Sequence, residues 1–313
     1  MGSASDPGAR LPAIFAVGSR ACGSPLWRVE SGHVGIGRAA WCPDRAASVG
    51  DGQATLEDFE QALGRLRNVA RPGWVAFGGH EDAFVPGVDP ARRDEVVVMV
   101  RRLLGLGVGV AMTTRGALPE ASALVALARM FPGRLSVRVG VFSLEAEVAA
   151  RWEPGLPGVA KRLALARELG DAGADVEVEL GPIVPFVNDD ARGLKEMMRT
   201  IARHGVGRVA VRWIEDASGL AEQVAAEVSR SASRLLEGWL HQPGSNHGAG
   251  QARGLAAPVR RARLQTITEA ARAFGREIAT CACQEGGHAG ACPSAPRAAA
   301  DRAQLELFGG TGS

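Results

Sequence analysis

Short runs of apolar, mostly β-branched residues recur along the middle of the chain, and a segment with the apolar spacing of an amphipathic helix separates each pair of runs. The runs lie at residues 74–77, 108–112, 135–142, 176–180 and 209–214, and another lies at residues 26–29. A parallel neighbour needs a crossover that is long enough to hold a helix. The pattern therefore predicts six parallel strands joined by five helical crossovers.

Right-handed crossovers between neighbouring strands would bend such a sheet into a barrel or an open part-barrel. We therefore expect an α/β fold, a partial (β/α)6 TIM-like barrel of parallel strands with a C-terminal helical and Cys-rich extension. The expected parts are a flexible leader at 1–25, the part-barrel at 26–241, a linker at 242–257, a helix plus Cys-rich loop at 258–292 and a disordered tail at 293–313.

Local signals mark where several helices begin. Thr55 and Asp58 have the spacing of a loose helix cap, and Asp89-Pro90 places a capping carboxylate before a first-turn proline. Apolar spacing predicts one helix at 220–240 and another at 258–278. On the fourth of the main strands, Glu177 and Glu179 alternate with valines, so we expect them to face solvent or a helix layer.

Composition narrows the class of protein. The chain has 46% hydrophobic and 22% charged residues, as an ordinary globular protein has, and a net charge of +2 gives no electrostatic case for general nucleic-acid affinity. No apolar run reaches the ~18 residues of a membrane helix, and the polar first ten residues lack a signal-peptide core. We therefore expect a cytoplasmic protein. Five cysteines, an odd number, argue against a disulfide scaffold.

Polar or glycine-rich turns follow most of the predicted strands. The turns are Gly78-Gly79-His80-Glu81-Asp82, Thr113-Thr114-Arg115-Gly116, and Gly181-Pro182-Ile183-Val184-Pro185 continuing to Asn188-Asp189-Asp190. Ligands of parallel α/β folds bind at the carboxyl ends of the strands, so we look for function at this rim. Arg115 and Arg212 can reach the rim, depending on strand alternation, and meet phosphate or carboxylate there. Because exposed arginines are common in this composition, we favour the alternative that both are exposed to solvent.

Those turns, together with Phe84, Pro86 and Glu153-Pro154-Gly155-Leu156-Pro157, follow one another in a familiar order and spacing. With them, residues of about 74–214 resemble the radical S-adenosylmethionine proteins related to spore photoproduct lyase, often described as DNA repair photolyase-like. That family has a glycine, threonine and aspartate turn, a threonine and lysine at a strand end, a Glu-Pro turn, and a Pro-Ile/Val-Pro loop at the matching places. The resemblance implies a lyase-type radical enzyme of DNA repair.

The resemblance also implies which residues would hold S-adenosylmethionine. They are Gly78, Gly79, Glu81, Asp82, Thr113, Arg115 and Asn188. For Glu81 and Asp82 an alternative is equally open, because an acidic pair at a strand end can cap the following helix.

The iron-sulfur motif of that family departs from its usual form in this chain. The family holds a four-iron cluster through thiolates spaced Cys-x3-Cys-x2-Cys in the loop after the first strand. Here Cys42 stands for the third thiolate, and Gly35 and Ala39 occupy the other two positions. A single thiolate does not hold the cluster, so the site is atypical or lost.

A second group of cysteines lies near the end of the chain. Cys281, Cys283, His288 and Cys292 form a Cys-x-Cys-x4-His-x3-Cys pattern. Three thiolates and an imidazole can close a zinc site, and three thiolates can hold an iron cluster with one open corner. The alternative is free thiols in a reducing cytosol and no metal. We favour a metal site because three of the five cysteines fall within twelve positions.

The tail carries one apolar island, in which Gln304, Leu305, Leu307 and Phe308 surround a polar residue. It resembles the peptide that binds the bacterial sliding clamp, whose apolar side chains dock in a groove. The alternative is a terminus that packs back onto the barrel. Two functions therefore remain open: a radical enzyme of DNA repair with an unusual cluster, and a noncatalytic repair accessory tethered to the clamp.

Overall fold

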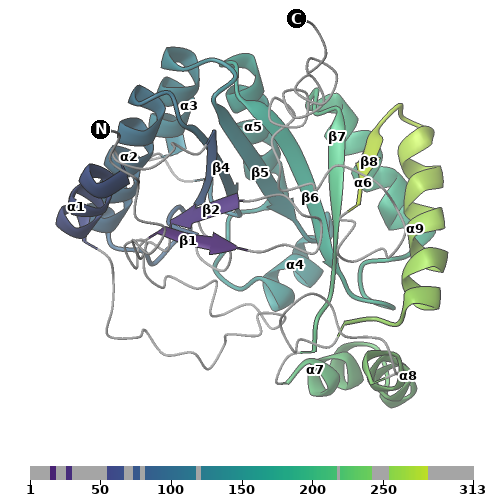
Figure 1. Ribbon diagram of the computed structural model, residues 1–313. Coiled ribbons are helices and arrows are strands. Elements are labelled where there is room, and N and C mark those ends of the chain that lie inside the picture. Colours follow the sequence, from purple (N-terminus) through teal and green to yellow (C-terminus); the bar gives the residue numbers. More distant parts are fainter. Residues whose placement is uncertain are drawn as a thin grey trace, which may run out of the picture.

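The computed structural model describes residues 15–18, 26–29, 55–66, 73–77, 82–117, 121–216, 219–241 and 254–280. Their strands form one sheet in the order β1-β2-β3-β4-β5-β6-β7-β8 (Figure 1). The strands are β1 Phe15–Gly18, β2 Leu26–Val29, β3 Trp74–Phe77, β4 Gly109–Thr114, β5 Leu135–Val141, β6 Asp175–Ile183, β7 Arg208–Trp213 and β8 Glu277–Ala279. The helices are α1 Leu56–Leu66, α2 Pro90–Gly105, α3 Ala121–Met130, α4 Ala146–Trp152, α5 Val159–Asp171, α6 Ala191–Arg203, α7 Leu220–Glu227, α8 Arg230–Leu240 and α9 Ala257–Arg272.

The predicted α/β architecture is confirmed. Every neighbouring pair from β2 to β8 is parallel, and each of the six predicted strands is present. The described strands form an open sheet with β1 and β8 at its edges, which is the expected partial TIM-like barrel. The carboxyl ends of these strands consequently lie along one rim, as the sequence predicted.

Two strands add to the six that were expected. β1 lies within the segment expected to be a leader, and it pairs antiparallel with β2. β8 replaces the last turn of the helix expected at 258–278, because Gly275 adopts a positive φ of 63° and the chain turns back beside β7. The parallel pairing of β8 with β7 joins this C-terminal segment to the same sheet, and helix α9 packs against α6.

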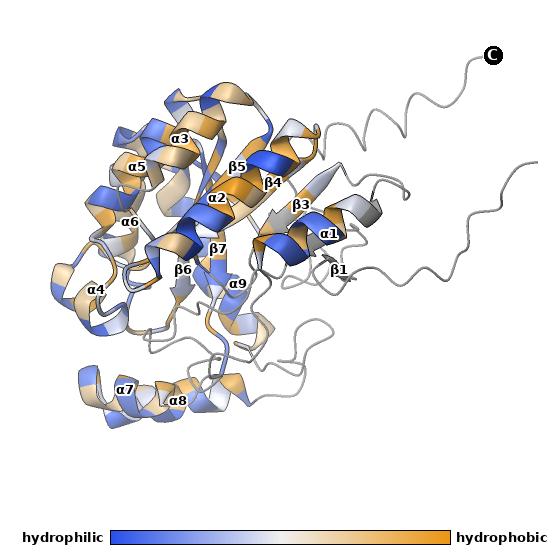
Figure 2. Cartoon of the chain, turned by 90° about the vertical axis from the view of Figure 1, so that its left-hand side faces the viewer, coloured by the Kyte–Doolittle hydropathy of each residue, from blue (hydrophilic) through white to orange (hydrophobic). Residues whose placement is uncertain are grey.

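The two faces of the sheet differ in chemistry. One face is apolar, and its side chains share a single core with the helices that cover it; Figure 2 shows α2, α3, α5 and α6 gathered on that side. Val139, Val178 and Val209 lie in register across three strands of this face and are fully buried. The apolar layer explains why these strands read as near-continuous hydrophobic runs in the sequence.

The opposite face, which we call the inner face, is charged. Glu177 and Glu179 lie on this face. Glu177 is in register with Arg138 and Arg208, and Glu179 lies beside Arg212. Both glutamates are almost completely buried. The expectation that they face solvent or a helix layer is therefore wrong, because the register pairs them with arginines that lie far away in the sequence.

Helix starts follow their sequence signals closely. The Thr55 backbone N–H and hydroxyl donate to the Asp58 carboxylate at 2.9 and 2.7 Å, and the Asp58 N–H donates to the Thr55 hydroxyl at 3.1 Å. The Asp89 carboxylate accepts from the Ala91 N–H at 2.9 Å, as expected before Pro90. The capping prediction at both helices is confirmed.

The helix expected at 220–240 is two helices, so that prediction is wrong. The break falls at Val228 and Ser229, where the Ser229 hydroxyl accepts from the Ala232 N–H at 3.0 Å and caps α8. Apolar periodicity runs through this break, so only the capping serine marks it. The two short helices pack against each other at the end of the molecule reached by β7 (Figure 1).

Parts of the expected boundaries fall outside the described residues. These include residues 242–253 of the linker and everything after Thr280. The last linker residues are described: Gly254 forms a bridge to Glu215, and Leu255 is fully buried. Among the described helices, none combines the length and apolar character needed to cross a bilayer.

Two glycines allow a paired test of the rim. A Cβ at Gly116, which follows β4, would lie 1.8 Å from the Phe84 carbonyl oxygen, whereas a Cβ at Gly238 in α8 would meet nothing within 4 Å. We expect Gly116→Ala to lower the free energy of unfolding by about 3 kcal/mol through overpacking against backbone. The control Gly238→Ala should raise it by roughly 0.5 to 1 kcal/mol through helix propensity. Urea denaturation measures both changes, and equal effects would contradict the tight approach at Gly116.

Candidate functional site at the carboxyl ends of the strands

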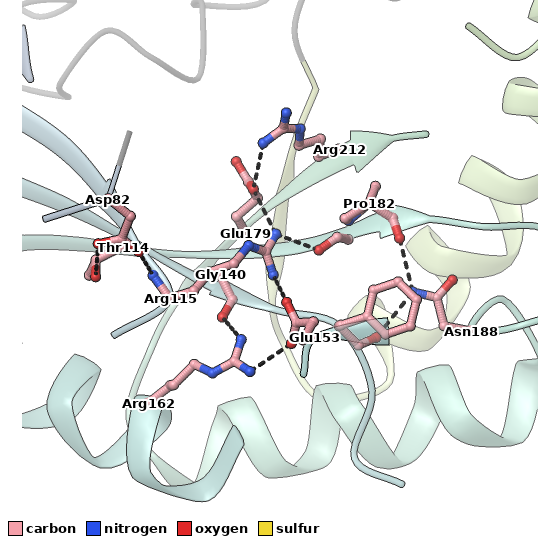
Figure 3. Close-up of polar contacts among 12 residues, drawn as sticks. Asp82, Thr114, Arg115, Gly140, Glu153, Arg162, Glu179, Pro182, Asn188 and Arg212 are labelled. Carbon is pink, nitrogen blue, oxygen red and sulfur yellow. Dashed lines mark hydrogen bonds and ion pairs between the residues drawn. The ribbon is translucent and has the colours of Figure 1, made fainter. Parts of the chain in front are cut away.

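The Arg115 guanidinium lies at the centre of the rim (Figure 3). Arg115 directly follows β4, and its side chain crosses β5 to donate to Glu153 at 2.5 Å, Glu179 at 3.2 Å and the Gly181 carbonyl at 2.7 Å. The side chain is 1% exposed, so the expectation of an exposed arginine is wrong for Arg115, because three acceptors from distant segments surround its guanidinium. One arginine thus ties together the ends of β4 and β6 and the turn after α4.

Glu153 connects Arg115 to a second buried arginine. Its other oxygen accepts from Arg162 of α5 at 2.6 Å, and Arg162 also donates to the carbonyls of Gly140 and Pro157 at 2.9 and 2.7 Å. The side chains of Glu153 and Arg162 are almost fully shielded from water. Removing one partner of such a buried pair costs about 3 to 5 kcal/mol, because the remaining charge is left uncompensated.

Gly140 on β5 makes the crossing possible. A Cβ at this position would lie 2.8 Å from the Cγ and Cζ atoms of Arg115. Any larger residue would therefore push the arginine away from Glu153 and Glu179. The backbone freedom of glycine is not what matters here; the absence of a side chain is.

Asp82 connects residues 82–84 to the end of β4. Its carboxylate accepts from the Arg115 N–H at 2.5 Å, the Thr114 hydroxyl at 2.9 Å and the Phe84 N–H at 3.0 Å. Burial raises the pKa of Asp82, and these hydrogen bonds and the Arg115 charge act in the opposite direction. Both carboxylate oxygens are engaged, so Asp82 joins the turn to the end of β4.

Asn188 fixes the long turn after β6 in a similar way. Its amide oxygen accepts from the Val184 N–H at 2.8 Å, and its amide nitrogen donates to the carbonyls of Phe142 and Pro182 at 3.1 and 3.0 Å. The residue therefore connects the turn to the end of β5. Gly181 and Pro182 are joined by a cis peptide bond.

The same turn contains a strained aromatic residue. Phe186 has a φ of 73°, which is rare for a bulky side chain and costs on the order of 1 to 3 kcal/mol. Its ring stacks on Trp239 of α8 at a centroid distance of 5.3 Å, and Arg263 of α9 lies over it. Arg263 also pairs with Asp189 at 2.9 Å, while burial raises the pKa of that carboxyl. Helices α8 and α9 thus hold the turn in its unusual conformation.

A network of ion pairs lines the inner face below this rim. Arg138 donates twice to Glu177, at 2.7 and 2.9 Å, and Arg208 approaches the other oxygen of Glu177 at 3.4 Å. Burial raises the pKa of Glu177 more than these arginines lower it. Burial also acts to raise the pKa of Glu179, but Arg212, Arg115 and Arg138 outweigh it and hold that pKa below its usual value.

The structure places four of the predicted cofactor-binding residues together at the rim. Asp82, Arg115 and Asn188 make the contacts given above, and Thr113 lies on the inner face in register with Arg138. Their predicted part in binding stays a prediction. The other candidates lie outside the described residues: Gly78, Gly79, Glu81, Cys42, Cys281, Cys283, His288, Cys292, Gln304, Leu305, Leu307 and Phe308.

Sequence reasoning did not identify Arg162 or Glu179 as parts of the site. Both contact the rim through partners that are distant in the chain, and Glu179 lies 64 positions from Arg115. Glu153 was noted as part of a Glu-Pro turn, but nothing local indicates its two arginine partners. Within the part of the chain that the structure describes, no group of three His, Cys, Asp or Glu side chains is arranged to hold a metal.

Comparison with solved structures identifies the fold. Spore photoproduct lyase complexed with dinucleoside spore photoproduct is 17% identical, with a TM-score of 0.58 over 77% of this chain and 73% of that chain. A cysteine-to-serine variant of the same lyase gives 16% identity and a TM-score of 0.57 over the same share of this chain. No protein-family model matches the chain, and no curated protein matches its sequence.

A further structural neighbour is more distant. SuiB from Streptococcus suis, bound to S-adenosylmethionine, is 11% identical with a TM-score of 0.45 and covers 74% of this chain and 44% of that chain. The likeness to spore photoproduct lyase shows that this chain has the same fold as that lyase.

The two inner-face glutamates predict opposite pH dependences. Because the pKa of Glu179 is lowered from 4.5, its ionised form stabilises the folded protein above pH 4.5. This contribution to the free energy of unfolding is lost as the pH falls through the folded-state pKa. Because the pKa of Glu177 is raised, protonation of the folded protein stabilises it as the pH falls toward 4.5. The stability difference between wild type and Glu179→Gln should shrink in acid, whereas that between wild type and Glu177→Gln should grow.

Urea denaturation from about pH 7 to about pH 3 measures both differences, since stability depends on proton uptake and the Glu179 effect develops below pH 4.5. Each variant serves as the control for the other, because both replace a buried inner-face glutamate on β6 with its amide. Parallel pH profiles for the two variants would contradict the assignment of opposite shifts.

Proposed function

We propose that this protein is a radical S-adenosylmethionine-like protein, related to spore photoproduct lyase, that acts in DNA repair with an atypical or lost iron-sulfur site. The observation that carries the proposal is the likeness to spore photoproduct lyase over 77% of the chain. That lyase was solved with a dinucleoside spore photoproduct, which supports damaged DNA as the class of substrate. For this function, and for the alternative below, we propose a cytoplasmic location.

The described geometry supports a division of work among the candidate cofactor-binding residues. Asp82, Arg115 and Asn188 already bond to neighbouring backbone and side chains, so we assign them to positioning the strand ends. Gly78, Gly79, Glu81 and Thr113 are left to contact S-adenosylmethionine. A carboxylate such as Glu81 is chemically suited to accept hydrogen bonds from the amino group of that cofactor.

The donor set at the front of the chain does not fit a standard four-iron cluster. Cys42 offers one thiolate, and the side chains of Gly35 and Ala39 offer no ligand. The thiolates of Cys281, Cys283 and Cys292, with the His288 imidazole, fit either a zinc ion or a cluster with one open iron by the chemistry of their atoms. A cluster bound there would supply electrons to S-adenosylmethionine, and we assign no catalytic step to it.

Anaerobic reconstitution of the full chain with iron and sulfide tests this proposal. If the enzyme form is correct, the protein will be brown, and the triple variant Cys281→Ser, Cys283→Ser, Cys292→Ser will lose the broad visible band. The matched control is Cys22→Ser with Cys42→Ser, which leaves all three C-terminal thiolates in place. A colourless wild-type protein would contradict an active cluster, and a zinc assay on the same sample would separate the zinc site from free thiols.

The second candidate is a noncatalytic repair accessory that binds the bacterial sliding clamp. Two features of the sequence favour this candidate. Cys42 is the only thiolate at the three positions of the family's cluster motif, and the tail carries the pentad from Gln304 to Phe308. Leu305, Leu307 and Phe308 would supply the apolar anchors, and the peptide would dock in an extended form.

Fluorescence polarisation with purified sliding clamp tests the tail directly. We expect Leu305→Ala with Phe308→Ala to weaken binding of the full chain by about tenfold or more, because truncating buried anchors removes most of the interface energy. Glu306→Ala, which changes the polar position between the anchors, should bind like wild type. Binding that survives loss of both anchors would rule out this peptide as the contact.

A further inference from the structure

A cavity of about 470 Å³ lies on the helix-covered side of the sheet, near the carboxyl ends of β5 and β6. Phe142, Leu180, Leu194 and Met197 form its floor. Leu180 belongs to the apolar face, opposite Glu179, so the cavity is separate from the inner face. Its size falls in the range of about 300 to 1,000 Å³ that is usual for small-molecule sites.

The floor of the cavity is apolar and firmly held. Phe142, Leu180, Leu194 and Met197 are each buried, and Phe142 stacks on Trp152 at a centroid distance of 5.5 Å. A rigid apolar floor favours an aromatic or aliphatic group over a hydrated one.

One wall is built from the strained turn. Val187 and Asn188 line the cavity, and their N–H groups both donate to the Val184 carbonyl. Phe186, directly before them, keeps its positive φ because Trp239 stacks on its ring and Asp189 accepts its N–H at 2.8 Å. These contacts thus hold the turn whose residues Val187 and Asn188 line the cavity.

The mouth of the cavity carries an excess of negative charge. Glu145, Asp190 and Glu196 line it, together with Arg192. Glu196 pairs with Arg199 at 2.6 Å. The net charge at the mouth is therefore set by the two carboxylates of Glu145 and Asp190 and the one guanidinium of Arg192. Glu145 precedes α4 but makes no capping hydrogen bond with its side chain, and it is exposed at the mouth. Its carboxylate is therefore placed to meet a cation.

We propose that this cavity binds a small organic amine, with an aromatic or aliphatic body on the apolar floor and a protonated amino group at Glu145 and Asp190. The N-terminus of α6 alone would favour an anion, but Asp190 already accepts from the Gly193 N–H there, and the carboxylates at the mouth disfavour a second negative charge. The site is independent of the iron-sulfur chemistry, and its ligand is a different class of molecule from DNA.

Three probes of nearly equal shape and different charge test the proposal on the full chain. Phenethylamine, phenethyl alcohol and hydrocinnamate are titrated by saturation-transfer NMR. We expect phenethylamine to bind with a dissociation constant of about a millimolar or below, since a ligand of this size has a limited affinity. The alcohol should bind about fivefold more weakly, in keeping with a partly exposed ion pair, and hydrocinnamate more weakly still.

Two variants and a matched control locate the binding. Glu145→Gln should weaken the binding of phenethylamine by about two- to fivefold and leave the affinity for phenethyl alcohol unchanged. Glu147→Gln, which changes a residue in the first turn of α4 that is 93% exposed and does not line the cavity, should change the affinity for neither probe. Leu144→Trp should fill the cavity and abolish binding of both, because Leu144 lines it and is partly exposed.

Several outcomes would overturn the inference. Equal affinity for the three probes, a preference for hydrocinnamate, or no binding by wild type would each exclude an amine site. Full binding by a folded Leu144→Trp protein would place the ligand elsewhere. Should circular dichroism show that Leu144→Trp is unfolded, the comparison of Glu145→Gln with Glu147→Gln still decides. None of these results depends on the cysteines, so they are independent of the DNA repair proposal.

Discussion

The buried ion pairs of Arg115, Glu153 and Arg162 hold the functional rim of this protein together. Two guanidinium groups share one carboxylate at 2.5 and 2.6 Å, and all three side chains are almost fully removed from water. Charges buried in this way are tolerated only when they are paired and their remaining hydrogen bonds are satisfied. The backbone carbonyls of Gly140 and Gly181 complete that requirement, so the ends of the neighbouring strands are fixed relative to each other.

This arrangement explains why charged residues occur on strands that are otherwise hydrophobic. The outer face of the sheet packs against helices, and its side chains are mostly apolar. The inner face is free of that constraint, and it pairs arginines and glutamates across neighbouring strands. Cross-strand pairs of opposite charge stabilise a sheet, and here they also form a polar surface beside the rim. A ligand that reaches the inner face therefore meets a preorganised set of charges.

The two proposed binding regions use opposite sides of the same strand ends. The inner side carries Thr113, which is proposed to contact S-adenosylmethionine, while the outer side carries the cavity proposed to hold an amine. The end of β6 and the turn after it take part in both regions: the Gly181 carbonyl accepts from Arg115, and Val187 and Asn188 line the cavity. Because α8 and α9 restrain this turn through Trp239 and Arg263, the C-terminal helices contribute to both regions.

The sequence by itself determined the elements and their direction. Apolar runs of the right length, separated by helical segments, predicted the six parallel strands, and local hydrogen-bonding residues such as Thr55, Asp58 and Asp89 predicted helix starts. The reason is that these signals act within a few residues of the chain. The break at Ser229 and the strand at Glu277–Ala279 were not predicted, because apolar spacing continues through the first and β8 depends on an edge supplied by β7.

Only the tertiary structure decided which rim residues touch. Arg115 was singled out from the sequence as a residue of the rim, but its partners lie 38 and 64 positions away, and no spacing rule connects them. The positions of Glu177 and Glu179 depended on strand register, since a shift by one residue would turn them to the helix layer. The cavity beside α6 likewise arises from segments that meet only in the folded chain, so its charge and shape could not be predicted from any one of them.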